Sequence, residues 1–164
     1  VYAELRTPIE PDETAGDLLD RLADEGAQLL VHVMDQLAAG TATATPQSSE
    51  GITVAPKLTV AEAQVRWDHP AFSVDRLVRG CTPDPGAWTT FRGQRVALGP
   101  VSLFTHDAPS LPPGRLLADK KSVVVGTATG PVLLSTVRPQ GKKEMAAADW
   151  ARGVRIDVGE DLGG

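Results

Sequence analysis

The sequence has 164 residues, of which 41% are hydrophobic and 23% charged, and its formal net charge at pH 7 is −5. This composition is typical of a folded globular protein and excludes an intrinsically disordered chain. No apolar run approaches the roughly 20 residues of a membrane-spanning helix, and no signal segment follows Val1, so we expect a cytoplasmic protein with no membrane partner. The single cysteine, Cys81, has no cysteine or histidine at metal-ligand spacing, which argues against a disulfide and a structural zinc.

The charges are divided unevenly along the chain. Residues 1–50 contain two basic and ten acidic side chains, residues 51–156 contain fourteen basic and eight acidic ones, and the last eight residues contain three acids. A polyanion would be repelled by the first part and attracted to the second. The positive excess is modest, and a solvated surface of mixed charge explains it equally well.

The start of the chain is predicted to form one strand and one amphipathic helix. Residues 1–9 contain β-forming side chains in partial alternation, which predicts a strand. Thr14 is a candidate N-cap with Asp17 in the first turn, apolar side chains then recur at helical spacing, and Gly40 is a stop signal. We expect Gly26 to break or bend this helix. A strand and a helix cannot bury their apolar faces on each other alone, so this segment is interpreted as the end of a larger α/β domain.

A linker and two short helices are predicted next. Residues 41–54 are rich in Thr, Ser, Gly and Ala without helical periodicity and are the best linker candidate. Thr59 and Glu62 have the spacing of a capping box, which predicts a short helix. A second helix is predicted from Ser73 to about Gly80, where the prolines that follow forbid its continuation.

The pattern then changes to short apolar runs separated by glycine and proline. Five strands are predicted, at residues 87–91, 95–104, 114–118, 122–127 and 132–137. Because no crossover helix fits between them, we predict a small antiparallel five-stranded barrel of the oligonucleotide-binding (OB) kind, with a small sandwich as the alternative. Residues 145–152 should add a final helical turn or two, and the tail, residues 157–164, is expected to be disordered. The overall class is α+β.

A series of motifs resembles the carboxyl-terminal region of methionyl-tRNA formyltransferases. In chain order the motifs are Asp12-Glu13-Thr14-x-Gly16, Lys57-Leu58, Ala61-Glu62-Ala63, Trp67-Asp68, Arg79, Pro83-x-Pro85-Gly86-Ala87-Trp88-Thr89-Thr90 and Pro139-x-Gly141-Lys142-Lys143-x-Met145-x-Ala147-x-Asp149. The resemblance extends over nearly the whole chain. One departure is Cys81-Thr82-Pro83-Asp84-Pro85, which stands where many members have Phe-Asn-Pro-Trp-Pro and weakens the case for an aromatic platform there.

The resemblance implies transfer of a formyl group from 10-formyltetrahydrofolate to the amino group of methionine on initiator tRNA, in translation initiation. It implies that residues 1–40 end a Rossmann-like catalytic formyltransferase domain, that residues 41–54 are a linker, and that residues 55–156 form an OB-like tRNA-binding domain. The family's catalytic asparagine, histidine and aspartate and its folate loop are expected upstream of Val1. We therefore expect this segment alone to be inactive, to bind no folate and to be monomeric.

A search for catalytic and metal sites agrees with that expectation. His32 lies among apolar residues, His69 precedes a proline and His106 lies in a predicted loop, with no recognisable nucleophile motif at any of them. Structural roles are favoured for all three. Cys81 should pack as a small apolar group. We predict no catalytic, cofactor-binding or metal-binding residue in this chain.

The residues predicted to contact the tRNA backbone are cations on or beside the barrel: Lys57, Arg79, Arg138, Lys142 and Lys143. Phosphate contacts need cations that project from a rigid frame. For each residue, a plain solvated surface charge is an equally good interpretation. Base stacking is open to the three tryptophans, Trp67, Trp88 and Trp150, although core packing is favoured in a chain with so few aromatic residues.

Two other interpretations stay open. The chain would also fit the C-terminal domain of another folate-dependent formyltransferase or hydrolase. Such an enzyme acts on a sugar nucleotide or on folate itself, and its C-terminal domain needs no RNA. A stand-alone RNA-binding module would have no enzyme attached. The Gly141-Lys142-Lys143-x-Met145 motif favours the tRNA substrate over the sugar nucleotide.

Overall fold

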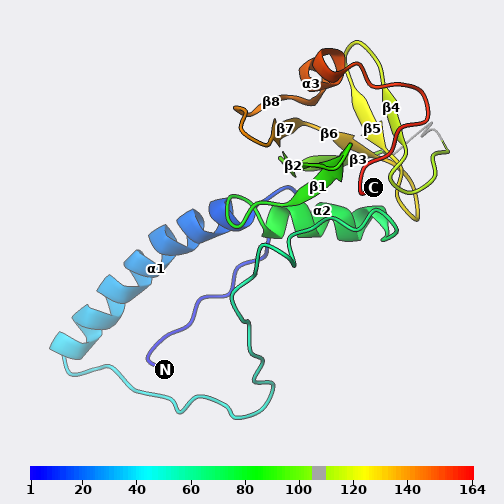
Figure 1. Cartoon of the computed structure of the whole chain (residues 1–164). Coiled ribbons are helices and arrows are strands. Elements are labelled where there is room, and N and C mark those ends of the chain that lie inside the picture. The colour runs from blue at the N-terminus through cyan, green and yellow to red at the C-terminus, as the bar shows by residue number, and fades with distance from the viewer. Residues whose placement is uncertain (105–109) are drawn as a thin grey trace. The chain divides into compact units, whose positions relative to one another are not determined.

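The computed structural model describes residues 1–104 and 110–164 (Figure 1). The chain divides into two compact units, Val1–Lys57 and Leu58–Gly164. The boundary falls just after the predicted linker, between a helical unit and a strand-rich unit. His106, which the sequence places in a loop, lies outside the described residues.

The first unit is built on helix α1 (Ala15–Ala38), of 24 residues. Thr14 caps it reciprocally: Asp17 N donates to Thr14 Oγ1 at 3.2 Å, and Thr14 N donates to Asp17 Oδ2 at 3.0 Å. Gly40 follows the helix end with φ of 68°, the left-handed conformation that glycine adopts there. The expected break at Gly26 is wrong, because one glycine costs only about 1 kcal/mol and does not interrupt a capped helix of this length.

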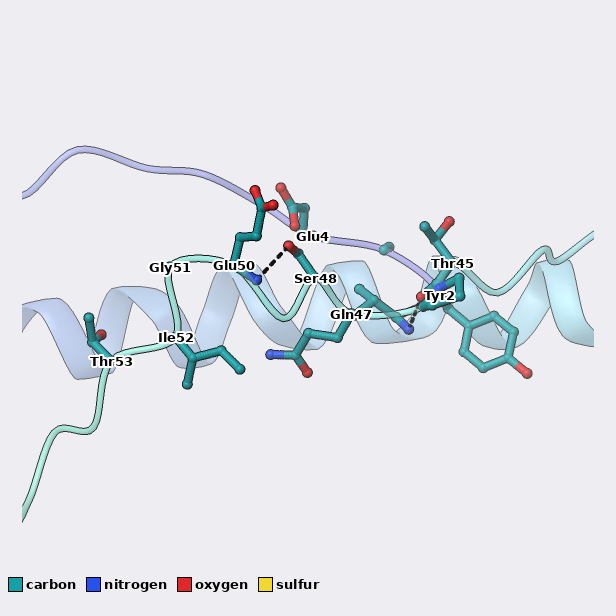
Figure 2. A pocket seen from close by; sticks show the side chains of 12 residues that line it. Tyr2, Glu4, Thr45, Gln47, Ser48, Glu50, Gly51, Ile52 and Thr53 are labelled. Atoms are coloured by element: carbon teal, nitrogen blue, oxygen red, sulfur yellow. Dashed lines mark hydrogen bonds between the residues drawn. The ribbon is translucent and has the colours of Figure 1, made fainter.

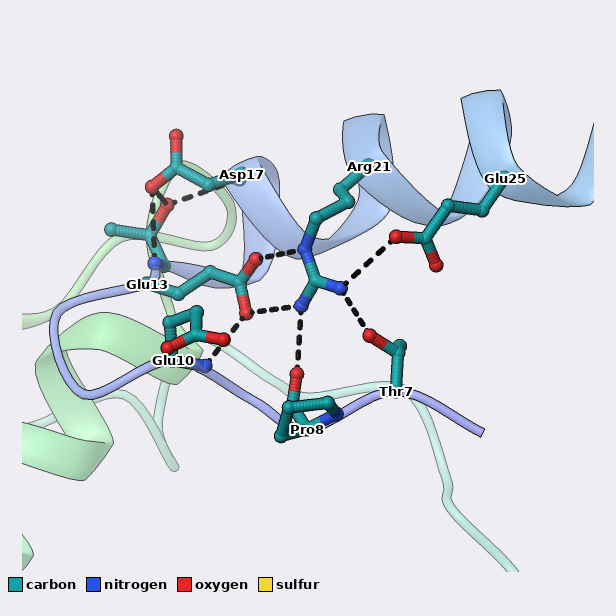
Figure 3. A network of polar contacts seen from close by, with 8 residues as sticks. Thr7, Pro8, Glu10, Glu13, Asp17, Arg21 and Glu25 are labelled. Carbon is teal, nitrogen blue, oxygen red and sulfur yellow. Dashed lines mark hydrogen bonds and ion pairs between the residues drawn. The ribbon is translucent and has the colours of Figure 1, made fainter. Parts of the chain in front are cut away.

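Arg21 ties the segment before α1 to the helix (Figure 3). Its guanidinium donates to the two carboxylate oxygens of Glu13 at 2.8 and 2.9 Å and to Pro8 O at 2.8 Å, and it also donates to Thr7 Oγ1. This pairing lowers the pKa of Glu13 and raises the pKa of Arg21. The network fixes the turn that leads into the helix.

The predicted strand at residues 1–9 is not formed. Val1 N donates to Thr45 O at 2.7 Å and Thr45 N donates to Val1 O at 2.8 Å, but this one pair of bonds does not make a ladder. Within the described residues, α1 has no buried side chain, and Leu19 and Leu30 are more than 60% exposed. Most of the apolar face that the sequence predicts is therefore exposed.

The second unit contains two four-stranded antiparallel sheets, with strand orders β1-β2-β7-β8 and β3-β6-β5-β4 (Figure 1). The strands of the first sheet are β1 (Trp88–Phe91), β2 (Gln94–Leu98), β7 (Thr136–Pro139) and β8 (Met145–Ala146). The strands of the second are β3 (Val101–Leu103), β4 (Leu116–Ala118), β5 (Val123–Val125) and β6 (Val132–Leu134).

The prediction of antiparallel strands is confirmed, but the count of five is wrong. The predicted strands 95–104 and 132–137 each bend and continue in the other sheet, because β2 pairs with β7 while β3 pairs with β6. The bends lie at Gly99 and Ser135. A Cβ at Gly99 would lie 2.1 Å from Thr136 Oγ1, so a side chain at this bend would displace the Thr136 hydroxyl. The described residues form two sheets and show no closed barrel.

Two helices pack against the sheets. Helix α2 (Ala71–Gly80) buries Val78 and lies beside β3, and α3 (Ala147–Val154) lies beside β5, β7 and β8. Trp150 of α3 packs edge-to-face against Phe91, with 5.1 Å between the ring centroids, and both residues belong to the hydrophobic core. No helix in the described ranges has the length and apolarity needed to cross a membrane.

The chain before α2 makes a single turn where a short helix is predicted. Thr59 and Glu62 do form the predicted box, with Thr59 N donating to Glu62 Oε2 at 2.8 Å. The next residues leave the turn because the backbone at Gln64 forms a bridge with Trp88. Trp67 is buried, in agreement with the core packing that is favoured in a chain with so few aromatic residues.

The tail, residues 157–164, is ordered, and the prediction of disorder is wrong. Leu162 is buried, and its amide donates to Gly114 O at 2.8 Å. The carboxylate of Glu160 accepts hydrogen bonds from Arg92 at 2.6 and 2.8 Å. Two of the three acidic residues that suggested a solvated tail, Glu160 and Asp161, are thus bound by arginines from distant parts of the chain.

Candidate functional site

The second unit carries a groove of about 470 Å³ along β2, β7 and the turn that follows β7. Its lining residues are Val60, Pro85, Gly86, Arg95, Ala97, Arg138, Pro139, Gln140, Gly141 and Lys142. Three of these residues are cations and none is acidic. Such a lining attracts an anion.

The pleat of the sheet places the two arginines of the groove on one face. Ala97 of β2 pairs with Arg138 of β7, and Gln140 N donates to the carbonyl oxygen of Arg95 at 3.0 Å. Since side chains alternate along a strand, Arg95, Ala97 and Arg138 share the face opposite to the buried Val96. Arg95 and Arg138 are diagonal neighbours, roughly 7–8 Å apart at their backbones.

Arg95 is held against an aromatic ring. Its guanidinium carbon lies 4.4 Å from the centroid of the Trp88 ring, a cation–π contact. Trp88 Nε1 donates to Val60 O at 2.6 Å, which fixes the indole. Sequence reasoning missed Arg95. The available signal was its alternation with the core residue Val96, which assigns Arg95 to the outer face of β2.

Lys142 and Lys143 lie in the turn between β7 and β8. Gly141 has φ of 73°, and Lys142 N donates to Pro139 O at 3.0 Å, which closes the turn. Both lysines are exposed. The structure therefore brings together three of the five predicted contacts, namely Arg138 and these two lysines.

The other two predicted contacts have different surroundings. Lys57 is exposed and is the last residue of the first unit. Arg79 lies on α2, where its guanidinium pairs with Asp75 at 3.0 Å and its side chain is only 14% exposed. Arg79 does not line the groove.

The groove cations differ in their partners from five other arginines of the second unit. Ion pairs are formed by Arg66 with Asp68, Arg79 with Asp75, Arg92 with Glu160, Arg115 with Asp161 and Arg152 with Asp149. In the described part of the chain, no carboxylate forms an ion pair with Arg95, Arg138, Lys142 or Lys143. Glu144 lines a second hollow, of about 220 Å³, that Arg138 also borders. An unpaired cation is available to an incoming anion.

The remaining candidates are placed as follows. His32 is exposed on α1, with its Nε2 3.1 Å from Gln36 Nε2, and His69 is exposed before α2. Cys81 is buried, and this burial raises the pKa of its thiol. Over residues 1–104 and 110–164, no group of three or more His, Cys, Asp or Glu side chains could hold a metal ion.

A further hollow, of about 640 Å³, lies in the first unit between residues 1–4 and 45–53 (Figure 2). Glu4 and Glu50 line it, and its lining contains no lysine or arginine. Glu50 N donates to Ser48 Oγ at 3.1 Å, a contact that shapes the wall. Unlike the groove of the second unit, this hollow has no lysine or arginine to bind an anion.

Comparison with known families matches residues 57–155 to the formyl transferase, C-terminal domain. The match covers more than half of the chain and includes both sheets, α2 and α3.

Curated relatives match almost the whole chain. The methionyl-tRNA formyltransferase of Salinispora arenicola is 57% identical over 162 residues, which cover 99% of this chain and 52% of that protein. The methionyl-tRNA formyltransferase of Thermobifida fusca is 56% identical over 163 residues, with the same two coverages. The chain spans about half the length of the curated relatives it matches.

Solved structures share the fold. A variant of HypX from Aquifex aeolicus has a TM-score of 0.70 at 19% identity and covers 93% of this chain and 28% of its own. HypX in complex with tetrahydrofolic acid has a TM-score of 0.62 at 22% identity and covers 82% of this chain and 24% of its own. At these identities the likeness concerns the fold alone.

Proposed function

This chain belongs to the family of formyl transferase C-terminal domains, and from that premise we propose that it is the tRNA-binding carboxyl-terminal part of a methionyl-tRNA formyltransferase. The full enzyme transfers a formyl group from 10-formyltetrahydrofolate to the amino group of methionine on initiator tRNA, in the cytoplasm. Relatives of that name, more than 50% identical to this chain, support the proposal.

The proposal assigns different roles to the parts of the chain. Residues 1–40 end the catalytic formyltransferase domain, residues 41–54 are a linker, and residues 55–156 form the tRNA-binding domain. The exposed leucines of α1, such as Leu19 and Leu30, support the first assignment, because apolar side chains that are exposed together on a helix mark a contact surface. Folate chemistry belongs to the remaining half of the enzyme, and this part binds no folate. The enzyme acts as a monomer.

The relation to OB folds is part of the proposal. Support comes from the two chain segments β2–β3 and β6–β7, which each run from one sheet into the other. Small barrels of the OB kind bind nucleic acid on the face of their sheet and on the adjoining loops. The groove on β2 and β7 has a corresponding location.

The observation that carries the proposal is the groove in which Arg95, Arg138 and Lys142 gather without an acidic side chain. Cations displayed on a rigid sheet neutralise phosphates and release counterions, which supplies sequence-independent affinity for nucleic acid. We assign the tRNA backbone contacts to Arg138, Lys142 and Lys143 and, from the first unit, to Lys57. Arg79 is the weakest member of the predicted set because Asp75 already binds its guanidinium.

The test is charge reversal in the full-length enzyme, Lys142→Glu together with Lys143→Glu. The matched control is Lys120→Glu with Lys121→Glu, the same change at two exposed lysines that do not line the groove. The affinity of the wild type for initiator tRNA should fall with salt with a log–log slope of about −3 to −4.5, for three to five neutralised phosphates. The groove variant should bind tRNA more weakly with a shallower slope, and the control should behave like the wild type.

The rate of formylation at saturating tRNA and the KM for 10-formyltetrahydrofolate should be unchanged in both variants. Unchanged tRNA affinity in the groove variant would remove these lysines from the site. Formyl transfer to a sugar nucleotide, or hydrolysis of formylfolate, with no activity on methionyl-tRNA, would replace the proposed function with the alternative that needs no RNA.

A further inference from the structure

Arg95 stands out among the groove cations because its position is set before any ligand arrives. Its guanidinium lies over the Trp88 ring at 4.4 Å from the centroid, and both side chains are half-buried. A guanidinium that is already oriented loses less conformational freedom when it binds an oxyanion.

Trp88 itself is fixed on several sides. Its Nε1 donates to Val60 O at 2.6 Å, its carbonyl oxygen accepts from Val65 N at 2.8 Å, and its amide donates to Ala63 O at 3.1 Å. The indole is therefore anchored, and Arg95 covers its ring. Trp88 is poorly placed to stack on a base, and Trp67 and Trp150 are buried in the core.

The surroundings of Arg95 favour phosphates over bases. Arg138 is its diagonal neighbour across β2 and β7, and Lys142 lines the same groove. The side chain between the arginines, Ala97, is small and leaves the cations accessible. The two guanidinium groups and the one ammonium group can donate hydrogen bonds to the oxygens of successive phosphodiesters.

We infer that Arg95 is the central phosphate-contacting residue of this groove and that Trp88 is a positioning residue for it, so that the groove binds the sugar–phosphate backbone of the RNA independently of base sequence. This inference rests on the proposed function, which supplies the RNA.

Two other arginine–aromatic contacts show what is particular about Arg95. Arg92 lies 4.7 Å from the Phe91 centroid, but Glu160 binds its guanidinium. Arg76 lies 5.4 Å from the Phe72 centroid, is exposed on α2 and does not line the groove. Arg76→Gln is therefore a matched control for Arg95→Gln, since both remove a cation that lies over an aromatic ring.

The test measures the affinity of the full-length enzyme for initiator tRNA and for an elongator tRNA over a range of salt concentrations. Arg95→Gln should weaken both affinities about tenfold, the loss of one charge-assisted contact, and should reduce the salt slope by about 0.9. Arg95→Lys should keep the slope. Arg76→Gln should match the wild type.

The role of Trp88 is tested with Trp88→Leu and with the double variant. Trp88→Leu should weaken tRNA binding while keeping the wild-type slope, because Arg95 is still charged. If Trp88 acts through Arg95, the double variant binds no more weakly than Arg95→Gln alone. Thermal unfolding of each variant checks that the fold is kept.

The outcomes separate the inference from the proposed function. A wild type that binds no tRNA overturns both. A wild type that binds tRNA, with an Arg95→Gln variant that keeps its affinity and slope, overturns this inference alone. A loss confined to one of the two tRNAs also overturns it, because such a loss means that bases are recognised. If the losses of tRNA-binding free energy in the two single variants add up in the double variant, Trp88 does not act through Arg95.

Discussion

Arg92 and Glu160, 68 positions apart in the sequence, form a two-point ion pair with N–O distances of 2.6 and 2.8 Å. Arg92 lies in the turn between β1 and β2 in the left-handed conformation, with φ of 48°. The same guanidinium donates to the carbonyl oxygen of Val154 at 3.1 Å, at the end of α3. One arginine thereby joins the first hairpin, the last helix and the tail.

This pair makes the docking of the tail dependent on pH. The hydrogen bond from Arg92 holds the pKa of Glu160 below its usual value of 4.5. A lowered carboxyl pKa gives a stabilising contribution that is present above the unfolded-state value and is lost as the pH falls through the folded-state value. Acidification below about pH 4.5 should therefore reduce the hydrogen-exchange protection of the Leu162 amide before that of the strands. Glu160→Gln should show reduced protection at neutral pH and lose this dependence. Equal protection of Leu162 in variant and wild type at all pH values would contradict the role of the pair.

Gly126 is predicted to be intolerant of any side chain. A Cβ there would lie 2.1 Å from Pro112 O and 2.7 Å from Leu111 O, both of them backbone atoms. Gly126→Ala should lower the free energy of unfolding by about 1–3 kcal/mol or more. The control is Gly153→Ala in α3, where nothing lies within 4 Å of the added carbon, and which should stabilise by up to about 1 kcal/mol. Urea unfolding of both variants measures the difference, and equal midpoints would refute the steric argument.

Features set by neighbouring residues were predictable from sequence. The ends of α1 follow from Thr14 and Gly40, and the burial of Trp150 follows from its place in an amphipathic turn. Features set by distant residues were not predictable. The tail is acidic and rich in glycine, which suggests a solvated chain, and only the spatial position of Arg92 and Arg115 shows why it is bound.

The candidate site shows the same division. Lys142 and Lys143 belong to the Gly141-Lys142-Lys143 motif and Arg138 lies just before it in the chain, so these three residues could be named as candidates from sequence. Arg95 was not predicted from the sequence. It is a candidate because its guanidinium lies over the Trp88 ring and because β2 pairs with β7, and only the folded sheet shows both contacts. Arg79 follows Asp75 by four residues, a spacing that pairs opposite charges on one face of a helix. The sequence therefore contained a reason to prefer the other cations to Arg79 as RNA contacts.

The buried hydrogen bond between Trp67 and Thr89 should matter for stability. Trp67 Nε1 donates to Thr89 Oγ1 at 2.9 Å, and both residues are buried. Thr89→Val keeps the shape of the side chain but leaves the indole N–H without an acceptor, which should cost about 1–3 kcal/mol in unfolding free energy. Thr89→Ser keeps the hydroxyl and should cost only about 1 kcal/mol for the lost methyl group. Chemical denaturation distinguishes the two, and a valine variant as stable as the serine variant would mean that the bond contributes little.

Gly26 and Gly40 should respond in opposite directions to the same substitution. Gly26 lies inside α1, and a Cβ added there would have nothing within 4 Å, so Gly26→Ala should stabilise the helix by about 0.5–1 kcal/mol. Gly40 has φ of 68°, so Gly40→Ala should destabilise by about 1–2 kcal/mol. Far-UV circular dichroism during thermal unfolding reports both changes. A loss of helix in Gly26→Ala would show that the protein needs the glycine for another reason.

Arg79 should prove to be a structural cation. Its guanidinium pairs with Asp75 at 3.0 Å, and both side chains are about 15% exposed. Arg79→Gln should therefore lower the unfolding free energy by roughly 0.5–2 kcal/mol, between the values for exposed and buried pairs, and should leave the salt slope of tRNA binding unchanged. Arg138→Gln should do the reverse, with little effect on stability and a slope reduced by about 0.9. Adding Asp75→Asn to Arg79→Gln should recover part of the lost stability, because it removes the carboxylate that is left without its partner. If Arg79→Gln instead weakens tRNA binding at unchanged stability, Arg79 contacts the RNA, as the sequence motif suggests.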